Sequence, residues 1–200
     1  MKYSRTLIAL VGVIVIAFVV IGVRIVIWSG QATDSGKAIP AIGGPFTLTD
    51  QTGKTVSDRD FQGRYMLIFF GYTFCPDVCP TTLSTVAAAL EKLGPAAARK
   101  VVPVFVTVDP ERDTAEVMRD YVGAFGSGFV GLTGTPDQIA KVAKAFKVYA
   151  AKVKGDSPGQ YSVDHSAILY LMGPDGRFVA HFTHGMSADD LAAGLKKHVG

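Results

Sequence analysis

Two uninterrupted apolar runs constrain the fold of this chain more than any other feature. They are YMLIFFGYT, over residues 65–73, and VVPVFVTVD, over residues 101–109. A strand that is apolar at nearly every position is typical of a parallel sheet whose two faces are both covered by helices. Because helical patterns follow both runs, the sequence predicts an α/β fold with parallel strands at its centre.

Helices are expected where apolar residues recur at helical spacing. The first covers about residues 81–94 and is stopped by Gly94-Pro95, and two more are expected over about 114–125 and 135–146. A last helix begins near Ser187, whose hydroxyl is a good N-cap.

Antiparallel pairs are expected at both ends of this region. PFTLTDQTGKTVS, over residues 45–57, has two β-type runs around a glycine-containing turn and predicts an N-terminal hairpin. Near the C-terminus, HSAILYLM and RFVAHF are predicted strands joined by the tight turn GPDG. The predicted fold class is an α/β sandwich with a mixed central sheet flanked by helices.

Residues 7–28, LIALVGVIVIAFVVIGVRIVIW, form a separate apolar segment of membrane-spanning length. A bilayer core about 30 Å thick needs roughly 20 helical residues. Arg24 is the only charged residue in this segment, and a guanidinium near a helix end reaches the headgroups by snorkelling. We therefore expect a single transmembrane helix. A cleaved signal peptide is the alternative, although secretory apolar cores usually run about 7 to 15 residues.

The charges around this segment predict its orientation. Lys2 and Arg5 precede it, whereas the next basic residue after Arg24 is Lys37. By the positive-inside rule, residues 1–6 are expected to be a short cytoplasmic stub.

The remainder of the chain is expected on the other side of that membrane. Residues 29–40, SGQATDSGKAIP, are small and polar and predict a flexible linker. Residues 41–200 then form one folded domain. The expected localisation is single-pass in the inner (cytoplasmic) membrane, with the C-terminal domain in the periplasm.

Charge balance argues against nucleic acid as a partner. The first 28 residues hold three of the 20 basic residues and none of the 17 acidic ones, which leaves 17 of each sign in the rest. A balanced domain without Lys/Arg runs has no electrostatic footprint for a phosphate backbone.

Both cysteines of the chain, Cys75 and Cys79, lie in GYTFCPDVCP between a predicted strand and a predicted helix. A structural disulfide would close a very short loop and stabilise the fold by only about 2 kcal/mol or less. A helix N-terminus favours thiolates, which serve both disulfide exchange and metal ligation. The spacing alone does not separate a redox pair from a metal site.

A third ligand would favour the metal site, and His165 is the best placed of the four histidines. It stands at the entrance of a predicted apolar strand, in YSVDHSAILYLM. His181 and His184 form a weak H-x-x-H pair, and His198 is expected to be solvated. Two thiolates and one imidazole suit Cu(I), and hold Cu(II) with a further weak ligand, whereas structural zinc takes four protein ligands.

The chain resembles the Sco/SenC family of copper-binding, thioredoxin-fold assembly factors for cytochrome c oxidase. The resemblance covers about Ile42 to His198. It rests on four segments in order, which are GYTFCPDVCP, VDPERDT, GLTGTPDQI and VDHSAILYLMGPDGRF.

The resemblance implies a site and a function. Cys75, Cys79 and His165 match the three copper ligands of the family, and the apolar span matches its single membrane anchor. The implied function is delivery of copper to the dinuclear copper centre of cytochrome c oxidase subunit II, with a copper donor chaperone and a thiol reductant as further partners. The alternative is a thiol-disulfide oxidoreductase that reduces the cysteines of that centre. A peroxiredoxin-like peroxidase is a third possible function. The argument against it is that GYTFC lacks the proline expected before the threonine in that family.

Three acidic residues near these motifs have open roles. Asp109 and Asp113, in VDPERDT, belong to the family pattern, and the alternative for them is a turn followed by an N-cap. Asp164 could orient the imidazole of its neighbour as metal-bound histidines require. However, adjacent residues in a strand point to opposite faces.

Overall fold

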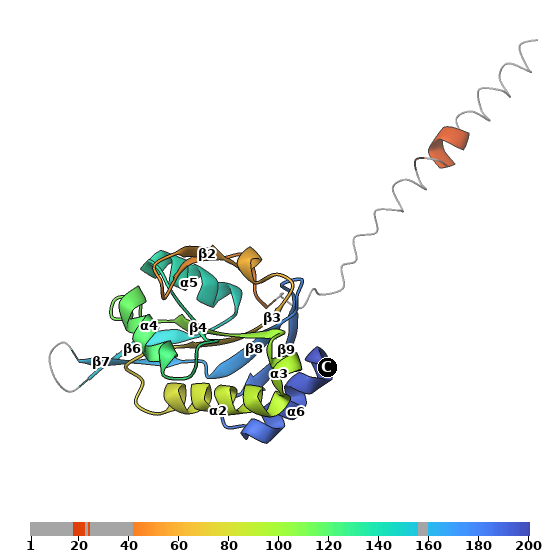
Figure 1. The fold of residues 1–200 in the computed structure, drawn as a ribbon. Coiled ribbons are helices and arrows are strands. Elements are labelled where there is room, and N and C mark those ends of the chain that lie inside the picture. Colours follow the sequence, from red (N-terminus) through yellow and green to blue (C-terminus); the bar gives the residue numbers. More distant parts are fainter. Residues whose placement is uncertain (1–17, 23, 25–41, 156–159) are drawn as a thin grey trace, which may run out of the picture. The chain divides into compact units, whose positions relative to one another are not determined.

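A computed structural model describes residues 18–22, 24, 42–155 and 160–200 of the chain (Figure 1). The chain divides into two units, Met1–Ile39 and Pro40–Gly200. Residues 18–22 and 24 are helical. No helix among the described residues is long and apolar enough to cross a membrane. The predicted anchor over 7–28 falls largely outside the described residues, and the stub and linker fall outside them wholly, so these remain predictions.

The second unit is built on a seven-stranded mixed sheet. The mixed character of the sheet was predicted, whereas the strand over residues 130–133 was not. The strand order is β2-β1-β5-β4-β3-β8-β9, in which β3, β4 and β5 pair in parallel and every other pair is antiparallel. The bounds are Thr47–Asp50 for β1, Thr55–Ser57 for β2, Tyr65–Gly71 for β3, Val101–Thr107 for β4, Val130–Thr133 for β5, Ile168–Met172 for β8 and Phe178–Thr183 for β9.

Helices cover both faces of this sheet (Figure 1). Side chains of α2, α4 and α6 join the core on one face, and those of α5 join the core on the other. The helices are α2 at Val78–Leu93, α3 at Pro95–Ala98, α4 at Ala115–Gly123, α5 at Pro136–Ala145 and α6 at Ala188–Val199, with a short 3-10 helix, η1, at Asp58–Phe61. This arrangement is the thioredoxin-like fold that the family resemblance implies.

Strand β3 shows why its sequence is apolar throughout. Leu67 and Phe69 belong to the core under α2 and α6, whereas Met66, Ile68 and Phe70 belong to the core under α5. Each of these side chains is almost completely buried. Burial of a large apolar side chain contributes about 1.5–3 kcal/mol, so the central strand is firmly fixed between the two layers.

A separate two-stranded sheet was not predicted from the sequence. Strands β6, at Ala150–Lys154, and β7, at Tyr161–His165, pair antiparallel with each other. The prediction that His165 opens the buried strand HSAILYLM is therefore wrong, because His165 ends β7 and β8 begins at Ile168. Residues of β6 and β7 are mostly exposed, which leaves little hydrophobic periodicity to reveal them.

The predicted N-cap of the last helix provides a stability test. The Ser187 hydroxyl oxygen accepts a hydrogen bond from the Asp190 amide at 3.1 Å. We expect Ser187→Ala to lower the free energy of unfolding by about 1 kcal/mol, measured by urea denaturation. Ser84→Ala, an exposed position inside α2, is the control and should change it by less than about 0.5 kcal/mol. Equal losses in both variants would contradict the capping role.

Candidate metal centre

The two cysteines follow the end of the central strand. Strand β3 ends at Gly71, Cys75 lies in the loop after it, and Cys79 lies in the first turn of α2. Cys79 is fully buried and Cys75 is partly exposed. The Cys79 amide donates to Cys75 Sγ at 3.4 Å, so the loop folds one sulfur back over the helix start.

A glycine at the end of β3 makes room for the buried sulfur. A Cβ on Gly71 would lie 2.6 Å from Cys79 Sγ and 2.8 Å from the Phe105 ring. Contacts this short do not occur for real Cβ atoms, so any larger residue would displace the sulfur or the ring.

His165 reaches the cysteines from the end of β7. Its Nε2 lies 3.5 Å from Cys79 Sγ, and its Nδ1 lies 3.2 Å from the carbonyl oxygen of Ser166. The rings of Phe69 and Tyr72 meet the imidazole edge-on, with centroids 6.0 and 5.9 Å away. A backbone carbonyl as partner of Nδ1 leaves Nε2 free to bind a metal.

Together these side chains form a group that could hold a metal ion. The ligand atoms of Cys75, Cys79 and His165 all lie within 4.8 Å of one another. Zinc–sulfur bonds are about 2.3 Å, so two such bonds span about 4.6 Å, and small side-chain adjustments would close this group on one ion. Among the described residues, His181, His184 and His198 belong to no such group.

Burial sets the protonation of two of these groups. It raises the pKa of the Cys79 thiol, which opposes the predicted effect of the helix N-terminus. Burial also lowers the pKa of His165, which keeps the imidazole neutral and able to bind a metal. A metal ion would therefore have to displace the proton of Cys79 on binding.

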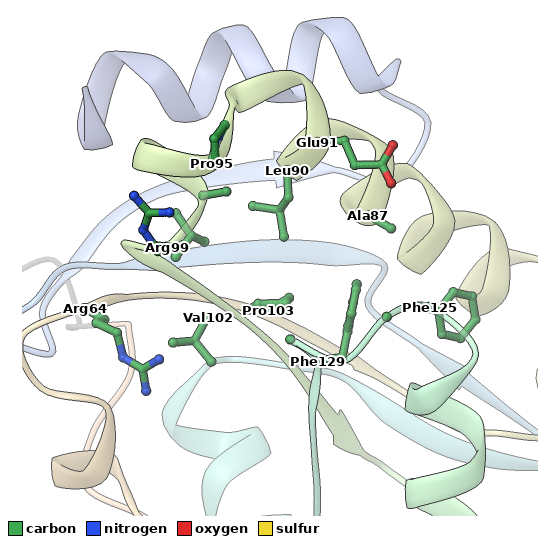
Figure 2. A pocket seen from close by; sticks show the side chains of 14 residues that line it. Arg64, Ala87, Leu90, Glu91, Pro95, Arg99, Val102, Pro103, Phe125 and Phe129 are labelled. Carbon is green, nitrogen blue, oxygen red and sulfur yellow. The ribbon is translucent and has the colours of Figure 1, made fainter.

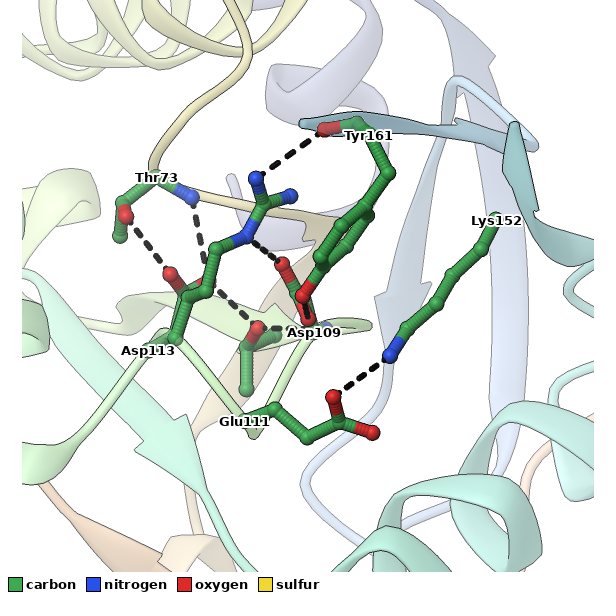
Figure 3. A network of polar contacts seen from close by, with 8 residues as sticks. Thr73, Asp109, Glu111, Asp113, Lys152 and Tyr161 are labelled. Carbon is green, nitrogen blue, oxygen red and sulfur yellow. Dashed lines mark hydrogen bonds and ion pairs between the residues drawn. The ribbon is translucent and has the colours of Figure 1, made fainter. Parts of the chain in front are cut away.

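Asp113 holds the loop that leads to the cysteines (Figure 3). Its carboxylate accepts from the Thr73 amide at 3.0 Å, from the Thr73 hydroxyl at 2.6 Å and from the Thr107 hydroxyl at 2.6 Å. Burial raises the pKa of Asp113 although these donors oppose the shift. The predicted alternative of an N-cap does not apply, because Thr114 caps α4.

Asp109 holds the strand that carries the histidine (Figure 3). It is fully buried, forms an ion pair with Arg112 and accepts from the Tyr161 hydroxyl at 2.8 Å. Arg112 Nη1 donates to the Tyr161 carbonyl oxygen at 3.0 Å, and the guanidinium lies 3.7 Å from the centroid of the Tyr161 ring. The VDPERDT segment thus contacts the first residue of β7, the strand that ends at His165.

Arg112 and Tyr161 were not predicted as part of the site. Arg112 also lies over the rings of Tyr72 and Phe74, with its guanidinium carbon 5.7 and 4.8 Å from their centroids. It therefore contacts both the loop that leads to Cys75 and the strand that ends at His165. The suggestion that Asp164 orients the imidazole is not supported. Asp164 is exposed, and the carbonyl oxygen of Ser166 is the group that contacts Nδ1 of the imidazole. The family motif was the signal that pointed to Asp109 and Asp113.

A hollow of about 660 Å³ lies away from this group (Figure 2). It is lined by Arg64, which precedes β3, by Val101 and Val102, which begin β4, and by Phe125 and Phe129. The cysteines instead follow the end of β3. No cysteine or histidine lines the hollow, so its chemistry is unrelated to metal ligation.

The close approach at Gly71 can be tested directly. We expect Gly71→Ala to lower the free energy of unfolding by about 1–3 kcal/mol, because the added methyl overpacks the core, and to weaken Cu(I) binding. Urea denaturation and Cu(I) competition titration measure the two effects. Gly123→Ala is the control, since its Cβ would meet open space. Unchanged Cu(I) affinity in Gly71→Ala would show that the sulfur position does not depend on this contact.

The anchoring of β7 gives a second test. Tyr161→Phe removes the hydroxyl that donates to buried Asp109 and should lower the free energy of unfolding by about 1–3 kcal/mol. Tyr149→Phe is the matched control, because Tyr149 is 62% exposed. Urea denaturation compares the two. Similar stabilities for both variants would contradict a structural role for this hydrogen bond.

Comparisons with known proteins identify the family of the chain. The SCO1/SenC family model matches residues 34–200. Protein SCO1 homolog 1, mitochondrial, of Arabidopsis thaliana is 40% identical over 169 residues, which cover 84% of this chain and 50% of that protein. The chain therefore spans about half the length of the curated relatives that it matches first.

Solved structures agree in fold. Bradyrhizobium japonicum ScoI with copper bound has a TM-score of 0.73 and 49% identity, and the match covers 79% of this chain and 99% of that one. BsSco, described as having a disulfide switch and as a member of the Sco family of cytochrome c oxidase assembly proteins, has a TM-score of 0.61 and 28% identity, with 80% and 94% covered. The family model extends over most of the sequence, and a copper-bound relative shares the fold at high identity. The chain belongs to the SCO1/SenC family.

Proposed function

We propose that this protein is a membrane-anchored copper metallochaperone. It binds one copper ion through Cys75, Cys79 and His165 and delivers it to the dinuclear copper centre of cytochrome c oxidase subunit II. The observation that carries this proposal is the convergence of two sulfurs and one imidazole nitrogen within 4.8 Å, in a chain whose relative has been solved with copper bound. The description of BsSco as belonging to a family of oxidase assembly proteins supports the choice of partner.

The ligand set suits an ion that must be passed on. Cu(I) is soft, prefers thiolates and is satisfied by two or three ligands, whereas a four-ligand cage would hold a metal permanently. Cys75 and His165 are partly exposed and Cys79 is buried. Thiolates of the partner would therefore replace the two accessible ligands first, and Cys79 would release the ion last.

Oxidation of the two cysteines would switch copper binding off. Formation of a Cys75–Cys79 disulfide removes two protons and two electrons, which an external oxidant must accept, and leaves only the imidazole of the ligand set. A thiol reductant that returns both electrons would then restore binding. The proposed partners therefore include a reductant as well as a copper donor chaperone.

The second candidate function is thiol-disulfide exchange, which the disulfide switch of BsSco favours. In this reaction the Cys75 thiolate attacks a disulfide in subunit II, which releases one partner thiolate and forms a mixed disulfide. Cys79 then attacks Cys75 Sγ, which releases the second partner thiolate. The partner gains two electrons, and this chain ends as a disulfide.

The proposed location follows from the sequence. Residues 7–28 anchor the protein in the inner membrane as a single span, with residues 1–6 in the cytoplasm and the copper-binding domain in the periplasm. Disulfide chemistry persists in that compartment, which agrees with a redox-controlled thiol pair.

Replacing the proposed nitrogen ligand separates the two functions. In the full chain in detergent, His165→Ala should weaken Cu(I) binding by at least about tenfold, equivalent to about 1.4 kcal/mol, as measured by anaerobic competition with a chelator. The reduction potential of the cysteine pair should change little, because His165 is no part of the disulfide.

His184→Ala is the matched control for this test. It removes an exposed imidazole near the site that belongs to no metal group, and it should leave Cu(I) affinity unchanged. If His165→Ala also leaves the affinity unchanged, His165 is no ligand, and the exchange function becomes the better account.

A further inference from the structure

A groove of about 690 Å³ lies beside the metal centre and takes no part in it. One wall is formed by α5, where the lining residues Ile139 and Ala143 are almost completely buried. The other wall is formed by Val148 to Ala150 and Lys152, where the chain enters β6. The exposed apolar residues of the groove are Pro136, Ala140, Tyr149 and Ala150, and apolar side chains of a partner could cover them.

The rim of this groove is positively charged. Lys144, Lys147 and Lys152 line it, and Glu111 is the only acidic residue that does. Glu111 pairs with Lys152 at 2.7 Å, which leaves two lysines uncompensated. Within the described part of the chain, neither Lys144 nor Lys147 forms an ion pair.

Lys147 occupies a position where glycine is usual. Its φ is 59°, and it is the only non-glycine residue with a positive φ among those described. The Val148 amide donates to the Ala143 carbonyl at 2.8 Å, which is the hydrogen bond of a helix-ending motif with a left-handed residue before it. Helix termination thus explains the positive φ of residue 147, but it does not explain why this residue is a lysine instead of a glycine. The lysine places an ammonium group on the rim.

One strand separates the groove from the metal centre. Ala150, on its wall, pairs with His165 on the adjacent strand, and neighbouring strands lie about 4.8 Å apart. Tyr149 exchanges hydrogen bonds with Ser166, whose carbonyl oxygen contacts the imidazole. A molecule in the groove would therefore lie one strand away from a proposed copper ligand.

An extended chain would find backbone partners there as well. Strand β6 pairs only with β7 among the described strands, so its other edge is open. Ala150 and Lys152 of β6 line the groove and no residue of β7 does, so the groove lies on the β6 side of this two-stranded sheet. Extended peptides often bind to such an edge while their side chains enter neighbouring pockets.

We propose that this groove docks an acidic, extended segment of the protein that receives the copper. The proposal rests on the proposed delivery to subunit II and adds the surface that recognises it. Acidic side chains of the segment would pair with Lys144 and Lys147. Its apolar side chains would cover Ala140, Val148 and Tyr149. Docking there holds the thiols of the partner beside the accessible ligands of the site, while opposite charge steers the encounter.

The test measures binding of the full chain in detergent to the isolated, reduced copper-receiving domain of subunit II by calorimetry. Lys144→Glu/Lys147→Glu should weaken binding by at least about tenfold at low ionic strength, with a smaller difference at physiological salt. Lys144→Arg/Lys147→Arg keeps the charges and should bind as the wild type does. Cu(I) affinity should be the same in all of these proteins, because neither lysine contacts a ligand.

Lys141→Glu/Lys197→Glu is the matched control. It changes the net charge equally, and Lys141 lies on the same helix but lines a different hollow. Urea denaturation of both double variants checks that the fold is retained, since acidic residues near the end of α5 oppose the helix dipole.

Three results would overturn the docking surface. These are no binding of the domain by the wild type, equal weakening in the two Lys→Glu pairs, and full binding by Lys144→Glu/Lys147→Glu. A copper transfer assay on the same mixtures distinguishes failure of the docking surface from failure of the proposed delivery of copper. A complex that is weakened only by Lys144→Glu/Lys147→Glu but passes no copper would support the docking surface and exclude delivery.

Discussion

Burial of β3 on both faces is the constraint on which the metal centre depends. Five consecutive side chains from Met66 to Phe70 alternate between two cores. A change in the register of the strand would therefore move apolar side chains out of the core in which they pack. The strand ends at Gly71, whose lack of a side chain leaves room for Cys79 Sγ beside Phe105. The position of one sulfur is thus fixed by the hydrophobic core rather than by the metal.

The other two proposed ligands are held by polar contacts. Asp113 binds Thr73 ahead of Cys75, and Asp109 with Arg112 binds Tyr161 at the start of the strand that ends at His165. Both carboxylates are fully buried and lie four residues apart in one segment. One rigid, buried sulfur and two accessible ligands on separately tethered segments suit an ion that must be held and then released.

The sequence predicted those parts of the fold that have strong periodicity. The mixed sheet, the N-terminal hairpin, the caps at Ser187 and Gly94 and the helices agree with the structure to within a few residues. Strands β5, β6 and β7 and the short helix α3 were not predicted. Strand β5 and helix α3 are only four residues long, and the mostly exposed residues of β6 and β7 carry no apolar pattern.

The candidate site was predicted only in part. The grouping of the cysteines with His165 was suggested by chemistry and by the family motif. The roles of Arg112 and Tyr161 depend on contacts 49 and 52 residues apart, which no local pattern encodes. The most direct test of the account is X-ray absorption at the copper edge on the one-to-one Cu(I) complex of the full chain. Two sulfur ligands and one imidazole nitrogen at bonding distance are the predicted result, with the nitrogen lost in His165→Ala. A site with sulfur ligands alone in the wild-type protein would contradict it.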